Sequence, residues 1–194
     1  MFGDPLLNQK GFKTELLSKA CLFNDYKGNI DSVDGKYWIL NLDKIESNTG
    51  KVLEKVYQSL DEIGDSTISF DENCVLYSKL RPYLNKVVIP DSKGYGTSEL
   101  ISMQVNEKIN KYFLASLLRS DSFVAYINSK TAGSKMPRAS MDVLRNFNLM
   151  IPNITAQNRF ADFVEQIDKS KFIVQERIKL YQELLNKKMD EYFN

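Results

Sequence analysis

The C-terminal segment, residues 155–193, carries the strongest periodic pattern in the chain. It contains no proline or glycine, so no residue in it interrupts a helix. Steps of four and three residues in alternation, starting at Phe160, reach mostly apolar side chains, which is the heptad spacing of a helix that faces another helix. Only Lys171 and Lys188 interrupt this heptad seam. Its apolar members are Phe160, Val164, Ile167, Val174, Ile178, Tyr181, Leu185 and Tyr192.

A helix of this length is too long for one small domain to cover. At ~1.5 Å per residue, residues 155–193 extend roughly 58 Å, whereas a domain of ~150 residues is about 30 to 40 Å across. Part of the seam therefore needs a partner helix, from a second copy of the chain or from another protein. The alternative is a helix that packs along its whole length on its own domain. We expect the former, and we predict a homodimer formed through this helix.

The middle of the chain is rich in short strands. Each predicted strand holds β-branched, aromatic or other apolar residues and is bounded by Asp, Asn, Gly, Pro or Ser. The segments are 37–42, 66–70, 74–80, 86–90 and 99–105, and a further strand is expected at 147–152. Together they predict a small mixed sheet or barrel.

Helical spacing occurs on both sides of these strands. Residues 14–21 predict a short helix, and residues 106–130 predict two helices divided by Ser120, a residue suited to a helix cap. Residues 130–140 are polar and predict an exposed basic loop. The expected fold class is α/β (α+β), with one domain over residues 1–152 and a long coiled-coil helix over residues 153–194.

Composition disfavours membrane and disulfide-stabilised proteins. No apolar run approaches the ~18 to 20 residues that span a bilayer, and the first residues lack a basic region followed by an apolar one. We therefore expect a cytoplasmic protein that has no contact with a membrane. Cys21 and Cys74 are far apart and form no C-x-x-C motif, so neither a disulfide framework nor a zinc site is expected.

The sequence also argues against catalysis. The chain has no histidine, which removes the commonest general base and transition-metal ligand. Residues 3–5, Gly-Asp-Pro, differ from the Asn/Asp-Pro-Pro-aromatic tetrapeptide of amino-methyltransferases. Residues 90–100 contain an Asp and a Glu, as a metal-dependent nuclease does, but the lysine required two residues after Glu99 is replaced by Ile101. We predict no enzyme activity, no bound metal and no cofactor.

Charge is distributed unevenly along the chain. Residues 1–74 carry 8 Lys and Arg against 13 Asp and Glu, a net charge of −5, whereas residues 75–145 carry 11 against 5, a net charge of +6. Residues 146–194 carry 7 of each. A basic middle third favours a polyanionic partner such as a nucleic acid. The alternative is that the acidic first third folds against the basic third and cancels its field.

Two basic segments stand out in this middle third. The first, Lys-Leu-Arg-Pro-Tyr-Leu at residues 79–84, follows an apolar strand, and its proline cannot donate to a strand ladder. The second, residues 130–140, mixes cations with glycine, serine and threonine. Cations and hydroxyl groups on exposed loops contact phosphates, and an arginine held in a loop can reach guanine. The alternative for each segment alone is a solvated loop or strand end with dispersed charges.

Three stretches resemble a known family. They are VLYSKLRPYLNKVVIP (75–90), GTSELISMQV (96–105) and the stretch from Tyr112 to Asp168 that contains LMIPNITAQNRFADFVEQID. The chain resembles the DNA-sequence specificity subunit of type I restriction-modification systems, with a target-recognition domain followed by a conserved helix. The opening MFGDPLLNQKGF is similar to the family's segment between its first conserved helix and its second recognition domain. One departure is Pro152-Asn153-Ile154, where Pro-Pro-Leu is commoner.

The resemblance implies a half subunit, because family members usually carry two recognition domains and two long helices. It implies sequence-specific binding of double-stranded DNA and docking of methyltransferase and restriction subunits, to which S-adenosylmethionine, ATP and Mg²⁺ would belong. Two copies related by a two-fold axis would read a symmetric bipartite target. The residues expected to contact DNA are Lys79, Arg81, Tyr83, Thr97, Ser98, Lys130, Ser134, Lys135 and Arg138.

Two other functions stay open at this point. The chain could be an adaptor that does not bind DNA, in which the long helix is the functional part. An autonomous methyltransferase or nuclease would need motifs that the sequence does not show.

Overall fold

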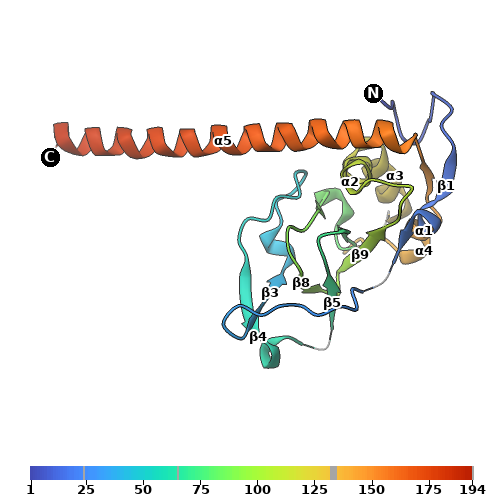
Figure 1. Cartoon of the computed structure of the whole chain (residues 1–194), viewed down its shortest axis with the longest axis horizontal. Helices are drawn as coiled ribbons and strands as arrows, with labels where there is room; N and C mark the ends of the chain where they lie inside the picture. The colour runs from blue at the N-terminus through green and yellow to red at the C-terminus, as the bar shows by residue number, and fades with distance from the viewer. Residues whose placement is uncertain (24, 65, 132–134, 194) are drawn as a thin grey trace.

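A computed structural model describes residues 1–23, 25–64, 66–131 and 135–193. Figure 1 shows a domain of small sheets and short helices beside one long helix, α5 (Ile154–Phe193), which runs along the domain and continues well beyond it. The α/β fold class and the uninterrupted C-terminal helix are confirmed. The division at residues 152 and 153 stays a prediction, because the first turns of α5 share the core of the preceding residues.

The first sheet is antiparallel and lies at the centre of the domain. Its strands are β2 (Cys21–Leu22), β9 (Leu100–Val105), β6 (Cys74–Ser78) and β7 (Val87–Val88), in that order. Every residue of β6 is buried, which explains why this strand reads as a continuous apolar run. The predicted strands at 74–80, 86–90 and 99–105 thus pair within one sheet.

The second sheet is mixed. It orders β4 (Val56–Ser59), β3 (Lys36–Leu40), β8 (Gly94–Thr97) and β5 (Thr67–Phe70), with β3 and β8 parallel and the other pairs antiparallel. Strand β8 was not expected, since its two glycines are poor strand formers. Packing requires one of them: a Cβ at Gly94 would lie 2.9 Å from the Trp38 carbonyl oxygen.

The predicted helix at residues 14–21 is wrong over half of its length. Residues 14–16 form β1 (Thr14–Leu16), which pairs antiparallel with β10 (Asn148–Met150), and only α1 (Leu17–Ala20) is helical before β2 begins. The apolar residues of so short a segment fit the spacing of a helix and that of a strand equally well. Residues 14–16 form a strand because they pair with the distant strand β10. The strand predicted at 147–152 is confirmed by β10.

The two predicted helices at 106–130 are confirmed as α2 (Lys111–Arg119) and α3 (Asp121–Thr131), separated by Ser120. The Ser120 hydroxyl donates to the carbonyl of Leu117, and the Asn110 side chain caps α2 by accepting from the N–H of Tyr112. A further short helix, α4 (Met141–Arg145), is capped by Ser140. Three single 3₁₀ turns complete the described elements: η1 (Leu42–Lys44), η2 (Leu60–Glu62) and η3 (Pro82–Leu84).

Two clusters of buried side chains hold the domain together. The larger cluster joins the central sheet to α2 and α3 and includes Leu114, Leu118, Phe123 and Ile127, none of which is exposed. The smaller cluster lies between the two four-stranded sheets and includes Trp38 and Phe70, whose rings meet edge to face at 5.1 Å. Burial of such apolar side chains is the main favourable contribution to folding.

The first turns of α5 are anchored to the domain. Gln157 and Ala161 are buried, and α5 packs against α2. The Phe160 ring meets Phe2 and Phe113 edge to face, at 5.6 and 6.3 Å between ring centroids. Phe160, the first residue of the predicted seam, therefore contributes to its own domain's core.

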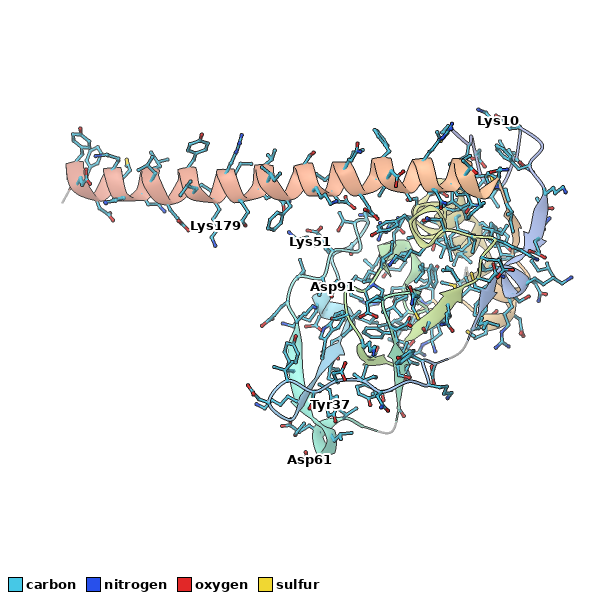
Figure 2. The ribbon with its side chains drawn as sticks, viewed as in Figure 1. Lys10, Tyr37, Lys51, Asp61, Asp91 and Lys179 are labelled. Atoms are coloured by element: carbon cyan, nitrogen blue, oxygen red, sulfur yellow. The ribbon has the colours of Figure 1, made fainter. Side chains whose placement is uncertain are left out.

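Beyond Ile167 every described residue of α5 is exposed. The five outer seam residues, from Val174 to Tyr192, have side chains between 50% and 80% exposed. Figure 2 shows this outer half of α5 with side chains standing free of the domain. The alternative of a helix packed along its whole length on its own domain is thus contradicted.

One further contact braces α5 from the side. The turn at residues 46–51 approaches the helix, and the Lys51 ammonium donates to the side-chain oxygen of Gln175 at 3.1 Å (Figure 2). The turn is fixed at Gly50, where φ is +70° and a Cβ would lie 1.7 Å from the Val87 carbonyl oxygen. That carbonyl accepts two hydrogen bonds from the half-buried Arg119 guanidinium.

Candidate nucleic-acid interface

Backbone hydrogen bonds join the two basic segments that the sequence singled out. Leu80 and Arg138 form an isolated antiparallel bridge. On one side of it the N–H of Ala139 donates to the carbonyl of Lys79 at 2.9 Å, and on the other the N–H of Arg81 donates to the carbonyl of Pro137 at 2.8 Å. Cations more than fifty positions apart are thereby held on adjacent backbone segments.

A third segment, the turn between β8 and β9, is hydrogen-bonded to the backbone of Lys79. The N–H of Lys79 donates to the carbonyl of Glu99 at 2.8 Å, in the turn between β8 and β9. This turn also contains Ser98, which is exposed, and follows Thr97, a half-buried residue whose hydroxyl oxygen is buried and therefore not placed to contact DNA. The backbones of residues 98–99, 79–81 and 137–139 are therefore adjacent, and these residues are called here the basic ridge.

Arg138 is paired on the basic ridge. Its Nη2 donates to one oxygen of Glu99 at 2.7 Å and its Nε donates to the other at 3.2 Å. The Arg138 side chain is 54% exposed and the Glu99 side chain 26% exposed, so the carboxylate lies deeper than the guanidinium. An ion pair with two parallel hydrogen bonds fixes the plane of the guanidinium.

Arg81 is held in an uncommon conformation. Its φ is +50°, in the left-handed region, and it precedes the 3₁₀ turn η3, which places Pro82 at its first position. Pro82 is buried, whereas Arg81 and Tyr83 on either side of it are exposed. The proline thus turns the chain sharply after the strand and leaves both neighbouring side chains at the surface.

The remaining predicted contact residues are less closely grouped. Lys130 lies in the last turn of α3, not in a loop as expected, and its ammonium is 5.6 Å from the centre of the Tyr126 ring. Helix α3 packs against η3, which places it beside the ridge. Lys135 is exposed, and Ser134 falls outside the described residues.

Sequence reasoning missed the role of Glu99, which it considered only as a nuclease carboxylate. The signal was weak, because a carboxylate 39 residues from its arginine partner has no recognisable spacing. Lys86, a cation two residues after the first segment, is engaged elsewhere: its ammonium donates to the carbonyl of Leu42 at 2.6 Å.

The described residues give no support to a metal site or to a reactive cysteine. Within the described ranges, no three or more Cys, Asp or Glu side chains gather as they would around a metal ion. Cys21 and Cys74 are free and buried, and burial raises the pKa of Cys21 to about 12 and that of Cys74 to about 11. None of the described helices has the length and apolar character needed to cross a membrane.

A comparison with known protein families shows to which family the chain belongs. The type I restriction modification DNA specificity domain matches residues 21–184, which is most of the chain. The chain belongs to this family. The family resemblance noted from the sequence is therefore confirmed, and the match extends from β2 through most of α5.

A curated relative agrees with this assignment. The specificity subunit of the EcoDI type I restriction enzyme of Escherichia coli is 28% identical to this specificity-domain chain over 125 residues. The aligned part is 63% of this chain and 27% of the relative.

Solved structures share the fold. A structure described as showing complex assembly and conformational transition of a type I R-M system matches with a TM-score of 0.69 at 17% identity, over 93% of this chain and 46% of the other. The HsdS subunit of Thermoanaerobacter tengcongensis also gives 0.69, at 20% identity, over 86% and 44%. The S subunit of M. genitalium gives 0.53 at 14% identity, over 82% and 39%. This specificity-domain chain thus spans less than half the length of each relative named.

Proposed function

We propose that this chain binds double-stranded DNA in a sequence-specific manner, as a half subunit of a type I restriction-modification complex. Its family membership supports this function, and the observation that carries it is the basic ridge. There, backbone hydrogen bonds bring Lys79, Arg81 and Arg138 together from two distant segments. Arg81 and Arg138 are exposed and Lys79 is half-buried. Cations at a protein surface contact phosphates, and an oriented arginine can read a base edge.

We extend the proposal to the oligomeric state. The outer half of α5 exposes apolar side chains at Val174, Ile178, Tyr181 and Leu185, which would be costly to leave in water. A second copy of the same helix, antiparallel to the first, would cover this seam and relate the two domains by a two-fold axis. Two identical domains would then read a symmetric bipartite target.

The helix carries a second apolar stripe that supports docking of other subunits. Ile173, Leu180 and Leu184 follow a spacing of seven and four residues, and their side chains are 53% to 62% exposed. At 100° per residue they lie about 120° around the helix from the seam. We propose that methyltransferase subunits, and a restriction subunit where one is present, dock here. In this proposal S-adenosylmethionine, ATP and Mg²⁺ belong to those subunits, and this cytoplasmic chain performs no chemistry.

A titration of DNA binding against salt tests the first part. Affinity for duplex DNA should fall steeply as salt rises, with the slope of log K against log salt reduced by about 1 for each phosphate contact removed. We expect Lys79→Ala and Arg81→Ala to weaken binding and to flatten this slope. Arg159→Ala, which removes an exposed arginine from α5, is the matched control and should behave as the unsubstituted chain.

The adaptor function remains a second candidate, since the exposed outer half of α5 would serve it equally well. Absence of binding to any duplex at low salt, alone and with a methyltransferase subunit present, would favour the adaptor and contradict the DNA-binding proposal.

A further inference from the structure

Glu99 places a negative charge on the surface that we propose to bind DNA. A carboxylate among Lys79, Arg81 and Arg138 lowers the positive charge of the ridge and repels phosphates. Yet its position is fixed: its carbonyl accepts from the N–H of Lys79, and its side chain holds Arg138 through two hydrogen bonds. The backbones of both partners are joined to residues 79–81, so neither can move away easily.

The ion pair leaves one edge of the Arg138 guanidinium without hydrogen bonds to Glu99. Glu99 accepts from Nε and from one hydrogen of Nη2, which occupies one side of the planar group. The two hydrogens of Nη1 and the second hydrogen of Nη2 lie outside this pair, and the Arg138 side chain as a whole is 54% exposed. An arginine fork of this shape matches the O6 and N7 acceptors of guanine.

We infer that Arg138 reads a guanine in the target sequence and that Glu99 is the positioning residue that aims its guanidinium. This inference rests on the proposed DNA-binding function and adds to it a base and the residue that specifies it. A phosphate contact needs charge and tolerates many orientations, so a carboxylate would only weaken it. A base contact needs one orientation, and the carboxylate supplies that orientation before DNA binds.

The first test selects duplexes from a randomised pool with the unsubstituted chain and with variants. The unsubstituted chain should select a motif with at least one fixed guanine. Arg138→Ala should lose the preference at that position, by about 5- to 150-fold, while preferences elsewhere in the motif remain. Lys79→Ala should weaken binding to all sequences alike, and Arg159→Ala should change nothing.

A separate variant, Glu99→Gln, tests the role of Glu99. Glu99→Gln keeps the size of the side chain but holds the guanidinium less firmly, so discrimination at the same guanine should fall, by less than in Arg138→Ala. A selected motif identical to that of the unsubstituted chain, together with a lower melting temperature, would show that Glu99 only stabilises the turn and would overturn its positioning role.

A modified base tests which atom of the guanine Arg138 contacts. Replacing the fixed guanine by 7-deazaguanine removes the N7 acceptor and should weaken binding by the unsubstituted chain but not by Arg138→Ala. If the unsubstituted chain selects no motif, the proposed function itself fails. If it selects a motif that Arg138→Ala shares at every position, sequence reading stands and the assignment of Arg138 is wrong.

Discussion

The side-chain oxygen of Gln157, in the first turn of α5, accepts a hydrogen bond from the backbone N–H of Asn110 at 2.9 Å. The nitrogen of the same amide donates to the carbonyls of Lys108 and Pro152, at 3.0 and 2.8 Å. Gln157 is fully buried, so one side chain satisfies three backbone groups that join α2 to the root of α5. An unsatisfied buried polar group is costly, which makes this amide a main support of the helix.

We expect Gln157→Leu to lower the free energy of unfolding by about 2 to 4 kcal/mol, because it leaves one N–H and two carbonyls without their partner. Urea titration followed by circular dichroism measures the change. Gln182→Leu is the control: Gln182 is exposed on the outer half of α5, and its replacement should change stability by less than about 0.5 kcal/mol. Equal effects of the two substitutions would contradict this role of Gln157.

Gly50→Ala should destabilise the chain by about 3 kcal/mol or more. The added Cβ would meet the Val87 carbonyl oxygen and the Arg119 guanidinium, and φ at this position is +70°. Gly35→Ala is a matched comparison, since Gly35 has a φ of +73° but no heavy atom within 4 Å of an added Cβ. Its cost should be only about 1 kcal/mol, the conformational part alone. The difference in melting temperature between the two variants isolates the steric contact of residue 50 with Val87 and Arg119.

The double substitution Ile178→Asp with Leu185→Asp should convert the proposed dimer to a monomer, because carboxylates would have to be buried in the seam. Sedimentation at several protein concentrations measures the mass. At 100° per residue, Lys179 lies about 100° or more around α5 from both apolar stripes, so Lys179→Asp adds a carboxylate there and should leave the dimer intact. A monomer for the unsubstituted chain at all concentrations would contradict dimer formation through α5.

Alkaline pH should weaken the fold through its buried thiols. Burial raises the pKa of Cys21 from an ordinary value of 9.0 to about 12. The folded chain therefore favours the neutral thiol, so the stabilisation is complete below about pH 9 and is lost as pH rises toward 12. Stability should fall by on the order of 1 kcal/mol per pH unit in this interval from Cys21 alone.

Comparison with Cys21→Ala isolates that contribution, because tyrosines and lysines titrate in the same range. The variant should show a shallower loss of unfolding free energy between pH 9 and 11 in denaturant titrations. Matching slopes for the two proteins would show that Cys21 does not ionise on unfolding. At pH 8 the native chain should also resist thiol-reactive reagents, whereas the unfolded chain should react at both cysteines.

The sequence predicted those elements whose signal is local. A long segment without proline or glycine and with apolar heptad spacing was enough for α5, and the hydroxyl of Ser120 marked the boundary between α2 and α3. The fold class and the family followed from these elements and from the stretches that resemble the family. Local rules failed at residues 14–16, which pair with a strand more than 130 positions away.

The candidate site shows the same division between local and distant interactions. The two basic segments were recognisable from composition, but their bridge through Leu80 and Arg138 depends on the fold. Glu99 could not be assigned to Arg138 for the same reason. Strand β8 was missed because it contains two glycines, which are poor strand formers, and one of them, Gly94, is needed for packing against Trp38.

The contact between Lys51 and Gln175 has a mechanical consequence. Of the contacts between α5 and the rest of the described chain, it lies farthest along the helix, so residues 175–193 form a lever arm roughly 27 Å long. A rotation of about 5° at this fulcrum displaces the far end by about 2 Å, close to the rise of one helical residue. If two copies pair through α5 as proposed, the same rotation in each copy would change the distance between the two domains, and its pivot would lie at a turn some 120 residues earlier in the chain than Gln175.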